Sequence, residues 1–146
     1  MRAAVLTEPG VVEVKEFDPR LPADKVAVAT IAAGICGTDL HAFAGHNPFL
    51  TYPRVMGHEI AGTVAAIGSE VTGVSLGQAV VVNPYNECGI CRTCHRGYPN
   101  LCPELSVTGV HTDGGFAEQA HVSPKQLHVL PAGIDLNTAE IGRAHV

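Results

Sequence analysis

The 146 residues match the size of one ordinary domain, and 46% hydrophobic against 16% charged residues exclude intrinsic disorder. A net charge of −5 without a run of like charges argues against a nucleic-acid or anionic-membrane partner. No apolar stretch reaches the ~20 residues that span a bilayer, and the apolar run after Met1 is too short for a signal peptide, so we expect a soluble, cytoplasmic protein.

The composition favours strands, because 18 Val and 7 Ile residues stand against 10 Leu, and β-branched side chains suit a pleated surface. In chain order, the expected strands are 3–6, 11–17, 25–33, 59–67, 79–82, 116–122 and 127–130. A short helix is expected over 38–44, with Thr38 or Asp39 as its N-cap and Gly45 at its end, and a second helix is expected to begin near Asp135. The pattern predicts a mainly β barrel or sandwich with one or two short helices.

Residues 83–104 follow neither the strand nor the helix period, so this loop must be held together by something other than its own core. It carries four thiols in the order Cys88-x2-Cys91-x2-Cys94-x7-Cys102. Four thiolates enclose a zinc ion as a tetrahedron and leave no position open, which is typical of a structural site. Reduced, unliganded thiols are one alternative, and an iron–sulfur cluster is another because Pro103 follows the last cysteine.

The fifth cysteine, Cys36, lies just before the expected short helix, where a thiolate is stabilised. A second segment carries His58 and Glu59 between Gly57 and Gly62. A cysteine, a histidine and an adjacent glutamate suit an open zinc site, which needs three protein ligands and one exchangeable position. The alternative for Cys36 is an ordinary buried cysteine.

These motifs resemble those of the zinc-dependent medium-chain alcohol and polyol dehydrogenases. The matching segments are 36–41 (Cys-Gly-Thr-Asp-Leu-His), 57–62 (Gly-His-Glu-Ile-Ala-Gly), the four-cysteine loop, and 113–118 (Asp-Gly-Gly-Phe-Ala-Glu). The resemblance runs from about residue 1 to about residue 140. It implies a GroES-like β-barrel over 1–140, with residues 83–104 as a zinc-binding lobe.

The resemblance also implies a role for each matching residue. Cys36 and His58 would ligate a catalytic zinc, and Glu59 would lie beside the ion as a direct or water-mediated ligand. Asp39 would orient the imidazole of His58, while Thr38 would bind the substrate hydroxyl and pass its proton towards His41. Cys88, Cys91, Cys94 and Cys102 would hold a structural zinc. Glu59 as the structural partner of a buried cation, and His41 as an ordinary exposed helix residue, remain alternatives.

Phe43, Phe49 and Tyr52 are expected either to line a substrate cleft or to pack in the core or at the surface. The six other histidines are expected at the surface or in turns, and they are His46, His95, His111, His121, His128 and His145.

The activity implied is hydride transfer from a secondary alcohol (a polyol, sugar alcohol or sugar acid) to NAD or NADP, in a homo-oligomer of the full-length form. A non-enzymatic, zinc-stabilised barrel for binding or assembly is the alternative function. An iron–sulfur electron-transfer module is the third.

Two departures from the family pattern qualify this expectation. The family's Rossmann domain carries G-x-G-x-x-G, and no such motif occurs in this sequence. One further zinc ligand is expected near position 143, where Arg143 cannot ligate, leaving Glu140 and His145 as alternatives. Residues 141–146 are therefore expected to be a truncated or non-native tail. We expect the chain to keep its lobe zinc, to hold the catalytic zinc weakly or not at all, to lack dehydrogenase activity alone, and to self-associate through exposed apolar surface.

Overall fold

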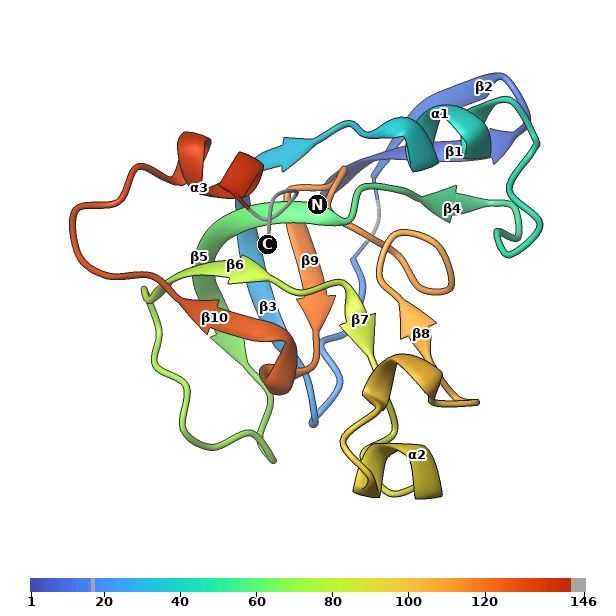
Figure 1. The fold of residues 1–146 in the computed structure, drawn as a ribbon. Coiled ribbons are helices and arrows are strands. Elements are labelled where there is room, and N and C mark those ends of the chain that lie inside the picture. The colour runs from blue at the N-terminus through green and yellow to red at the C-terminus, as the bar shows by residue number, and fades with distance from the viewer. Residues whose placement is uncertain (17, 143–146) are drawn as a thin grey trace.

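The structure is a computed structural model that describes residues 1–16 and 18–142 (Figure 1). Its strands are β1 (Arg2–Glu8), β2 (Val11–Glu16), β3 (Val26–Gly34), β4 (Arg54–Val55), β5 (Glu59–Ile67), β6 (Ala79–Val82), β7 (Tyr85–Asn86), β8 (Ser106–Val107), β9 (Gln119–Val122) and β10 (Leu127–Val129). The α-helices are α1 (Gly37–Phe43), α2 (Arg92–His95) and α3 (Leu136–Gly142), and short 3-10 turns span Pro99–Leu101 and Pro124–Gln126. Strands thus dominate the described chain, which confirms the mainly β class predicted from the sequence.

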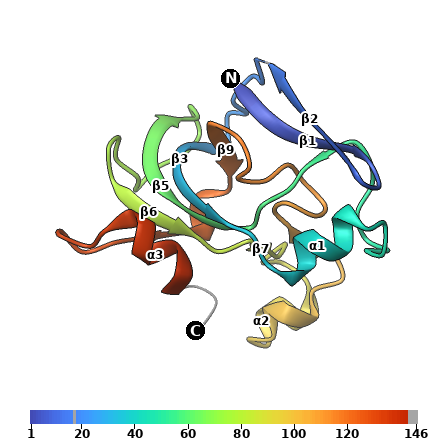
Figure 2. The same cartoon turned by 90° about the horizontal axis from the view of Figure 1, so that it is seen from above.

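The strands form three antiparallel sheets. The largest has the order β10-β6-β5-β3-β9, a second has the order β2-β1-β4, and β7 pairs with β8 alone. Figure 2 shows the β1–β2 hairpin and α1 on one side of the molecule, with β6 and α3 on the other. The helices therefore lie around the sheets instead of forming a layer of their own.

The main core lies on one face of the five-stranded sheet. Alternating strand residues supply it because successive side chains point to opposite faces. Its buried members are Val26, Val28, Ile60, Val64, Val80, Val82, Ala120 and Val122. The register places Val26 opposite Val122, Val28 opposite Ala120 and Ile60 opposite Val82, so these core residues pack as cross-strand pairs. The strands of this sheet were predictable from short apolar runs bounded by turn residues, such as Ala79–Val82 before Asn83.

Strands β3 and β5 of the large sheet curve strongly, and β5 bends through a wide arc in Figure 1. Their pairing shifts register between Ala27 and Val28 and again between Thr30 and Ala32, as β-bulges do. Gly62 lies at the point of closest approach, where an added Cβ would stand 2.1 Å from the carbonyl oxygen of Ala29. The missing side chain thus allows the two backbones to meet.

A second core connects the β1–β2 hairpin to α1. Its buried members are Leu6, Ala42, Leu50, Met56 and Val110. The hairpin turn is fastened to the end of the helix, since the Gly10 N–H donates to the Phe43 carbonyl at 2.7 Å. Tyr52 packs against the same core and donates its hydroxyl to the Ala42 carbonyl at 2.8 Å. Tyr52 is therefore a packing residue, one of the two roles left open by the sequence.

The expected strands are all present, with differences at their ends. The strand expected over 116–122 begins only at Gln119, because the residues before it leave the large sheet for β1. There the Ala4 N–H donates to the Phe116 carbonyl at 2.8 Å, and Ala117 bridges Ala3. The sequence did not indicate β4, β7, β8 or α2, since two to four residues display no period.

The helix expected near Asp135 is also present as α3. The Asp135 carboxylate accepts hydrogen bonds from the Thr138 hydroxyl at 2.8 Å and the Asn137 N–H at 3.3 Å, which fixes the first turn. Residues 143–146, which include Arg143 and His145, lie outside the described residues, so the expected non-native tail is not described beyond Gly142. Among the described residues, none of the helices combines the length and apolar character that crossing a membrane requires.

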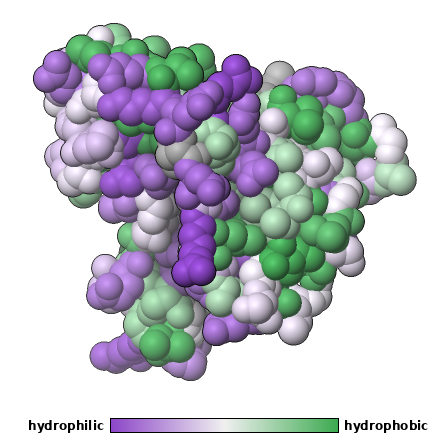
Figure 3. Space-filling view, turned by 180° about the vertical axis from the view of Figure 1, so that it is seen from behind, coloured by the Kyte–Doolittle hydropathy of each residue, from purple (hydrophilic) through white to green (hydrophobic). Residues whose placement is uncertain are grey.

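Hydrophobic side chains also reach the surface. Figure 3, which views the molecule from behind, shows them gathered in patches between polar ones. Among the large exposed residues are Val14, Ile31, Ile35 and Leu40, each at least half exposed. Apolar surface of the kind expected from the sequence is thus present, while self-association stays a prediction.

Substitution of Ile60 by alanine is expected to lower the free energy of unfolding by about 2–5 kcal/mol, since Ile60 is fully buried in the main core. The matched control is Ile31→Ala, because Ile31 is 53% exposed and its truncation is expected to change that energy by less than about 0.5 kcal/mol. Urea unfolding followed by circular dichroism measures both. Equal losses would contradict this placement of the core.

Candidate metal centres

The four-cysteine segment forms a lobe that projects from the barrel beside β7 and β8 (Figure 1). Between residues 85 and 107 only Cys102 is buried, so the lobe has no apolar core of its own. Its base is fastened by the buried Gln126, whose side-chain amide donates to the Asn83 carbonyl at 2.9 Å and the Thr108 hydroxyl at 3.1 Å. Lys125 adds an ion pair with Glu87 at 3.3 Å.

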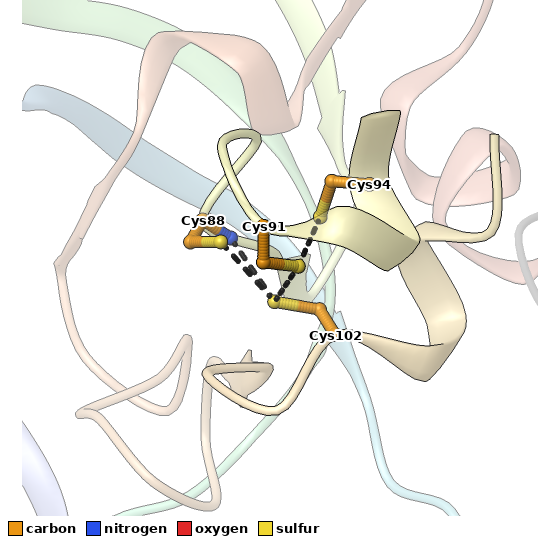
Figure 4. A group of neighbouring side chains, drawn as sticks. All are labelled: Cys88, Cys91, Cys94 and Cys102. Atoms are coloured by element: carbon orange, nitrogen blue, oxygen red, sulfur yellow. Dashed lines mark hydrogen bonds between the residues drawn. The ribbon is translucent and has the colours of Figure 1, made fainter. Parts of the chain in front are cut away.

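The four thiols of the lobe point towards one another (Figure 4). The Sγ atoms are 3.5 Å apart for Cys91 and Cys94, 3.9 Å for Cys91 and Cys102, and 3.5 Å for Cys88 and Cys102. A tetrahedron with zinc–sulfur bonds of ~2.3 Å has edges of about 3.8 Å. The observed spacing fits four thiolates around one zinc ion, and Gly89 (φ +75°) provides one of the tight turns that bring them together.

The surroundings of Cys91 and Cys94 in the lobe shift the pKa values of their thiols in opposite directions. Hydrogen bonds from the Thr93 hydroxyl and the Cys94 backbone lower the pKa of Cys91 to about 6. Burial and the neighbouring Cys91 raise the pKa of Cys94 to about 12. Zinc takes thiolates, so an ion entering the lobe must displace the Cys94 proton.

The second centre arises where β3 and β5 pair at one end of the large sheet. The register places Gly34 opposite Glu59, and this brings the residues just after β3 against those just before β5. Cys36 Sγ then lies 2.9 Å from His58 Nε2. A ligand atom of Glu59 lies within 4.8 Å of both, so the structure brings together all three residues singled out by the sequence.

Cys36 begins helix α1 and is its N-cap, which corrects the expectation that Thr38 or Asp39 would take that position. The Cys36 Sγ accepts from the Thr38 N–H at 3.3 Å, and the Asp39 carboxylate accepts from the Cys36 N–H at 3.0 Å. Asp39 is the third helical residue of this capping box. The sequence reading missed it because cysteine is an uncommon cap.

Asp39 also reaches the second ligand segment. Its carboxylate is 4% exposed, accepts the Gly57 N–H at 3.3 Å, and lies 3.7 Å from His58 Nδ1. That nitrogen is buried without a hydrogen bond among the described residues. The carboxylate is thus adjacent to the imidazole, as expected for an orienting partner, but beyond hydrogen-bond distance.

The donor set of this centre suits a zinc ion. One thiolate, one imidazole and one carboxylate are zinc ligands, and three protein ligands leave a position for water or substrate. The sulfur and nitrogen atoms would stand about 3.6 Å apart around such an ion, so binding needs only a small separation from the 2.9 Å observed. The two donor sets therefore differ in kind: four sulfurs would close one site around its ion, whereas three ligands would leave the other site open.

The two expected relay residues lie on the exposed surface of α1. Thr38 and His41 are three residues apart, which places both on one side of the helix. Next to Asp39 lies an apolar groove of about 450 Å³, lined by Ile35, Leu40, Phe43 and Phe116 among others. Phe43 therefore lines an apolar groove that includes Asp39, although none of the three candidate ligands lines it.

Phe49, His111 and His121 belong to neither candidate ligand set among the described residues. Phe49 is exposed and packs its ring 6.2 Å from that of His111. His111 accepts the Val107 N–H at 3.1 Å, and burial lowers the pKa of His121. Neither of these histidines joins a metal-ligand cluster among the described residues.

Comparison with known proteins identifies the family. The model of the alcohol dehydrogenase GroES-like domain matches residues 22–132. The chain is 42% identical over 135 residues to the starvation-sensing protein RspB and 41% over 143 residues to L-galactonate-5-dehydrogenase, both of Escherichia coli K12. These matches cover 92% and 97% of this chain but 40% and 42% of the relatives.

Solved structures give the same result. RspB of E. coli CFT073, determined with NADH, has a TM-score of 0.89 at 38% identity, and galactitol-1-phosphate dehydrogenase of E. coli has 0.90 at 32%. Each match covers 97% of this chain and 41% of the other. The chain thus spans about two fifths of the length of these relatives. It belongs to the zinc-type medium-chain alcohol and polyol dehydrogenase family, and it matches that family's GroES-like N-terminal domain.

Proposed function

We propose that residues 1–140 are the catalytic domain of a dehydrogenase that oxidises a secondary alcohol of a polyol or sugar acid with NAD or NADP. The observation that carries this proposal is the open donor set of Cys36, His58 and Glu59 beside the helix that bears Thr38 and His41. Residues 83–104 serve as a structural-zinc lobe of the same domain. A barrel used only for binding or assembly has no need of the open set.

The substrate class is supported by the relatives. L-galactonate-5-dehydrogenase, at 41% identity, and D-altritol 5-dehydrogenase of Agrobacterium fabrum, at 44%, are named for a sugar acid and a sugar alcohol. L-threonine 3-dehydrogenase of Pyrococcus horikoshii, at 37%, is named for a hydroxy amino acid. A hydroxyl on a carbon next to further polar groups is common to all three.

The chain's own residues divide the chemistry between them. Cys36, His58 and Glu59 hold the ion, which when bound supplies a Lewis acid that favours the deprotonated alcohol oxygen. Thr38 accepts the proton of the substrate hydroxyl and passes it to His41, which is exposed and releases it to water. Hydride acceptance is the chemistry of the nicotinamide cofactor. RspB binds NADH and a Sinorhizobium meliloti relative binds NADP, so both forms of the cofactor belong to the proposal.

The first prediction concerns the lobe. Cys102→Ser is expected to remove one zinc equivalent and to expose residues 88–102 to proteolysis, because the ion replaces the missing lobe core. Cys36→Ser is the matched control, since it removes a thiol from the other centre and should leave the lobe intact. Elemental analysis and limited proteolysis give both readouts. A brown, iron-containing sample would instead support the electron-transfer alternative.

The second prediction concerns Asp39. Asp39→Asn keeps the size of the side chain but removes the charge facing His58, so the open centre should bind Co²⁺ about 10–100-fold more weakly. Asp135→Asn is the control, because it changes an exposed carboxylate just before α3 and keeps a side chain that can cap the helix. Spectroscopic Co²⁺ titration separates the open centre from the four-thiolate centre. Unchanged affinity would show that Asp39 caps α1 and binds the Gly57 N–H but does not strengthen metal binding through His58.

The third prediction tests the activity itself. The 146-residue chain alone should show no turnover, because its sequence lacks the dinucleotide motif. A chimera in which it replaces the matching part of E. coli L-galactonate-5-dehydrogenase should oxidise sugar acids or polyols with NAD or NADP. In that chimera Thr38→Val should lower kcat about 10²–10⁴-fold.

The control for the relay is Thr72→Val, which makes the same change at an exposed site outside α1. Turnover should fall to background in the Cys36→Ser chimera. An active Cys36→Ser chimera would overturn the proposed function. A folded chimera that holds one zinc ion per chain and has no activity on any alcohol would favour the binding barrel.

A further inference from the structure

A distant segment of the chain lies along the residues that lead into the open centre. Residues 113–116 run beside residues 55–57, which directly precede His58. All three carbonyls of residues 55–57 accept hydrogen bonds from this segment. Val55 accepts from the Gly114 N–H at 2.8 Å, Met56 from the Phe116 N–H at 3.0 Å, and Gly57 from the Gly115 N–H at 2.8 Å. The backbone of residues 55–57, which leads to His58, is therefore held by a hydrogen bond at each residue.

The side chain of Asp113 fastens the start of the same stretch. Its Oδ1 accepts the Val55 N–H at 3.1 Å and an Arg54 guanidinium N–H at 3.1 Å. Asp113 itself is 60% exposed, so it holds strand β4 from the surface. Residues 54–57 thus receive contacts from every residue of segment 113–116.

The two backbones lie too close for side chains. A Cβ on Gly114 would stand 2.1 Å from the Gly57 carbonyl oxygen and 2.6 Å from that of Met56. A Cβ on Gly109 would also lie 2.6 Å from the Gly57 oxygen. Any larger residue at position 114 must push the Gly57 peptide away, because real Cβ atoms do not approach oxygen so closely.

The Gly57 peptide is held from two sides. Its N–H donates to Asp39 and its carbonyl accepts from Gly115, while its φ of +89° is one that glycine adopts without strain. A Cβ here would lie 2.6 Å from the Phe116 ring. The peptide bond that carries His58 therefore has one orientation.

We propose that segment 113–116 is a positioning element for His58: it fixes the Gly57–His58 peptide and so directs the imidazole towards Cys36 and Glu59. The His58 ring needs such support, because its Nδ1 makes no hydrogen bond among the described residues and Asp39 lies 3.7 Å away. The ring is then aimed by its backbone more than by a side-chain partner. This inference rests on the metal centre of the proposed function.

The test compares Gly114→Ala with Gly37→Ala in the 146-residue chain. Both make the same chemical change near the open centre, but a Cβ on Gly37 meets no atom within 4 Å. Co²⁺ titration should show about 10–100-fold weaker binding at the open centre of Gly114→Ala. The four-thiolate centre of that variant, and both centres of Gly37→Ala, should keep the affinity of the parent chain. A general loss of structure would weaken both centres together.

A second variant decides the matter if Gly114→Ala does not fold by circular dichroism. Asp113→Ala removes an exposed carboxylate and should weaken the open centre alone, by less than Gly114→Ala would. Unchanged Co²⁺ affinity in a folded Gly114→Ala, or in Asp113→Ala when the first variant is unfolded, overturns the positioning role. If the parent chain binds Co²⁺ only at the four-thiolate centre, as its missing ligand leads us to expect, the same variants are compared in the L-galactonate-5-dehydrogenase chimera. A chimera that also binds no Co²⁺ at the open centre overturns the proposed metal centre, and the positioning role with it.

Discussion

The open centre depends on one buried carboxylate. Asp39 accepts the N–H of Cys36 and the N–H of Gly57, and so connects the two chain segments that carry the thiol and the imidazole. A carboxylate that is 4% exposed would be costly without partners, and the two backbone donors offset that cost. The same contacts start helix α1. The Asp39 carboxylate therefore both caps the helix and holds the two ligand segments together, so a substitution that removes one role also removes the other.

The two centres are assembled by different forces. Hydrogen bonds between strands and the packing of the barrel bring Cys36, His58 and Glu59 together, so their arrangement is part of the fold. The four-cysteine lobe has Gln126 and a two-stranded ladder at its base but almost no buried side chains. A zinc ion held by its four sulfurs would supply the bonds that stabilise the lobe beyond that base. The fold of the domain thus positions Cys36, His58 and Glu59, whereas the four-cysteine lobe would depend on its ion for its own folding.

Much of the candidate site was predictable from the sequence, because metal-ligating residues occur at characteristic separations along a chain. The separations of Cys88, Cys91, Cys94 and Cys102 are those of a tetrahedral site, and short apolar runs rich in β-branched residues marked the strands of the large sheet. The capping role of Cys36 was not predictable from preferences, since serine, threonine and acidic residues dominate at that position. The strands β4, β7 and β8 were not predicted, because a two-residue strand has no periodicity and is defined only by its pairing with another strand.

The sequence by itself determined the composition of both donor sets, the strand-rich class and the family, because residue types, spacings and periodicity are local properties. Only the tertiary structure decided which distant residues support them. The register of β3 on β5 placed His58 against Cys36, and the close approach of Gly114 to Gly57 revealed a contact between segments more than fifty residues apart. Such contacts arise when backbones meet in space, and a glycine in a sequence does not say which backbone it will meet.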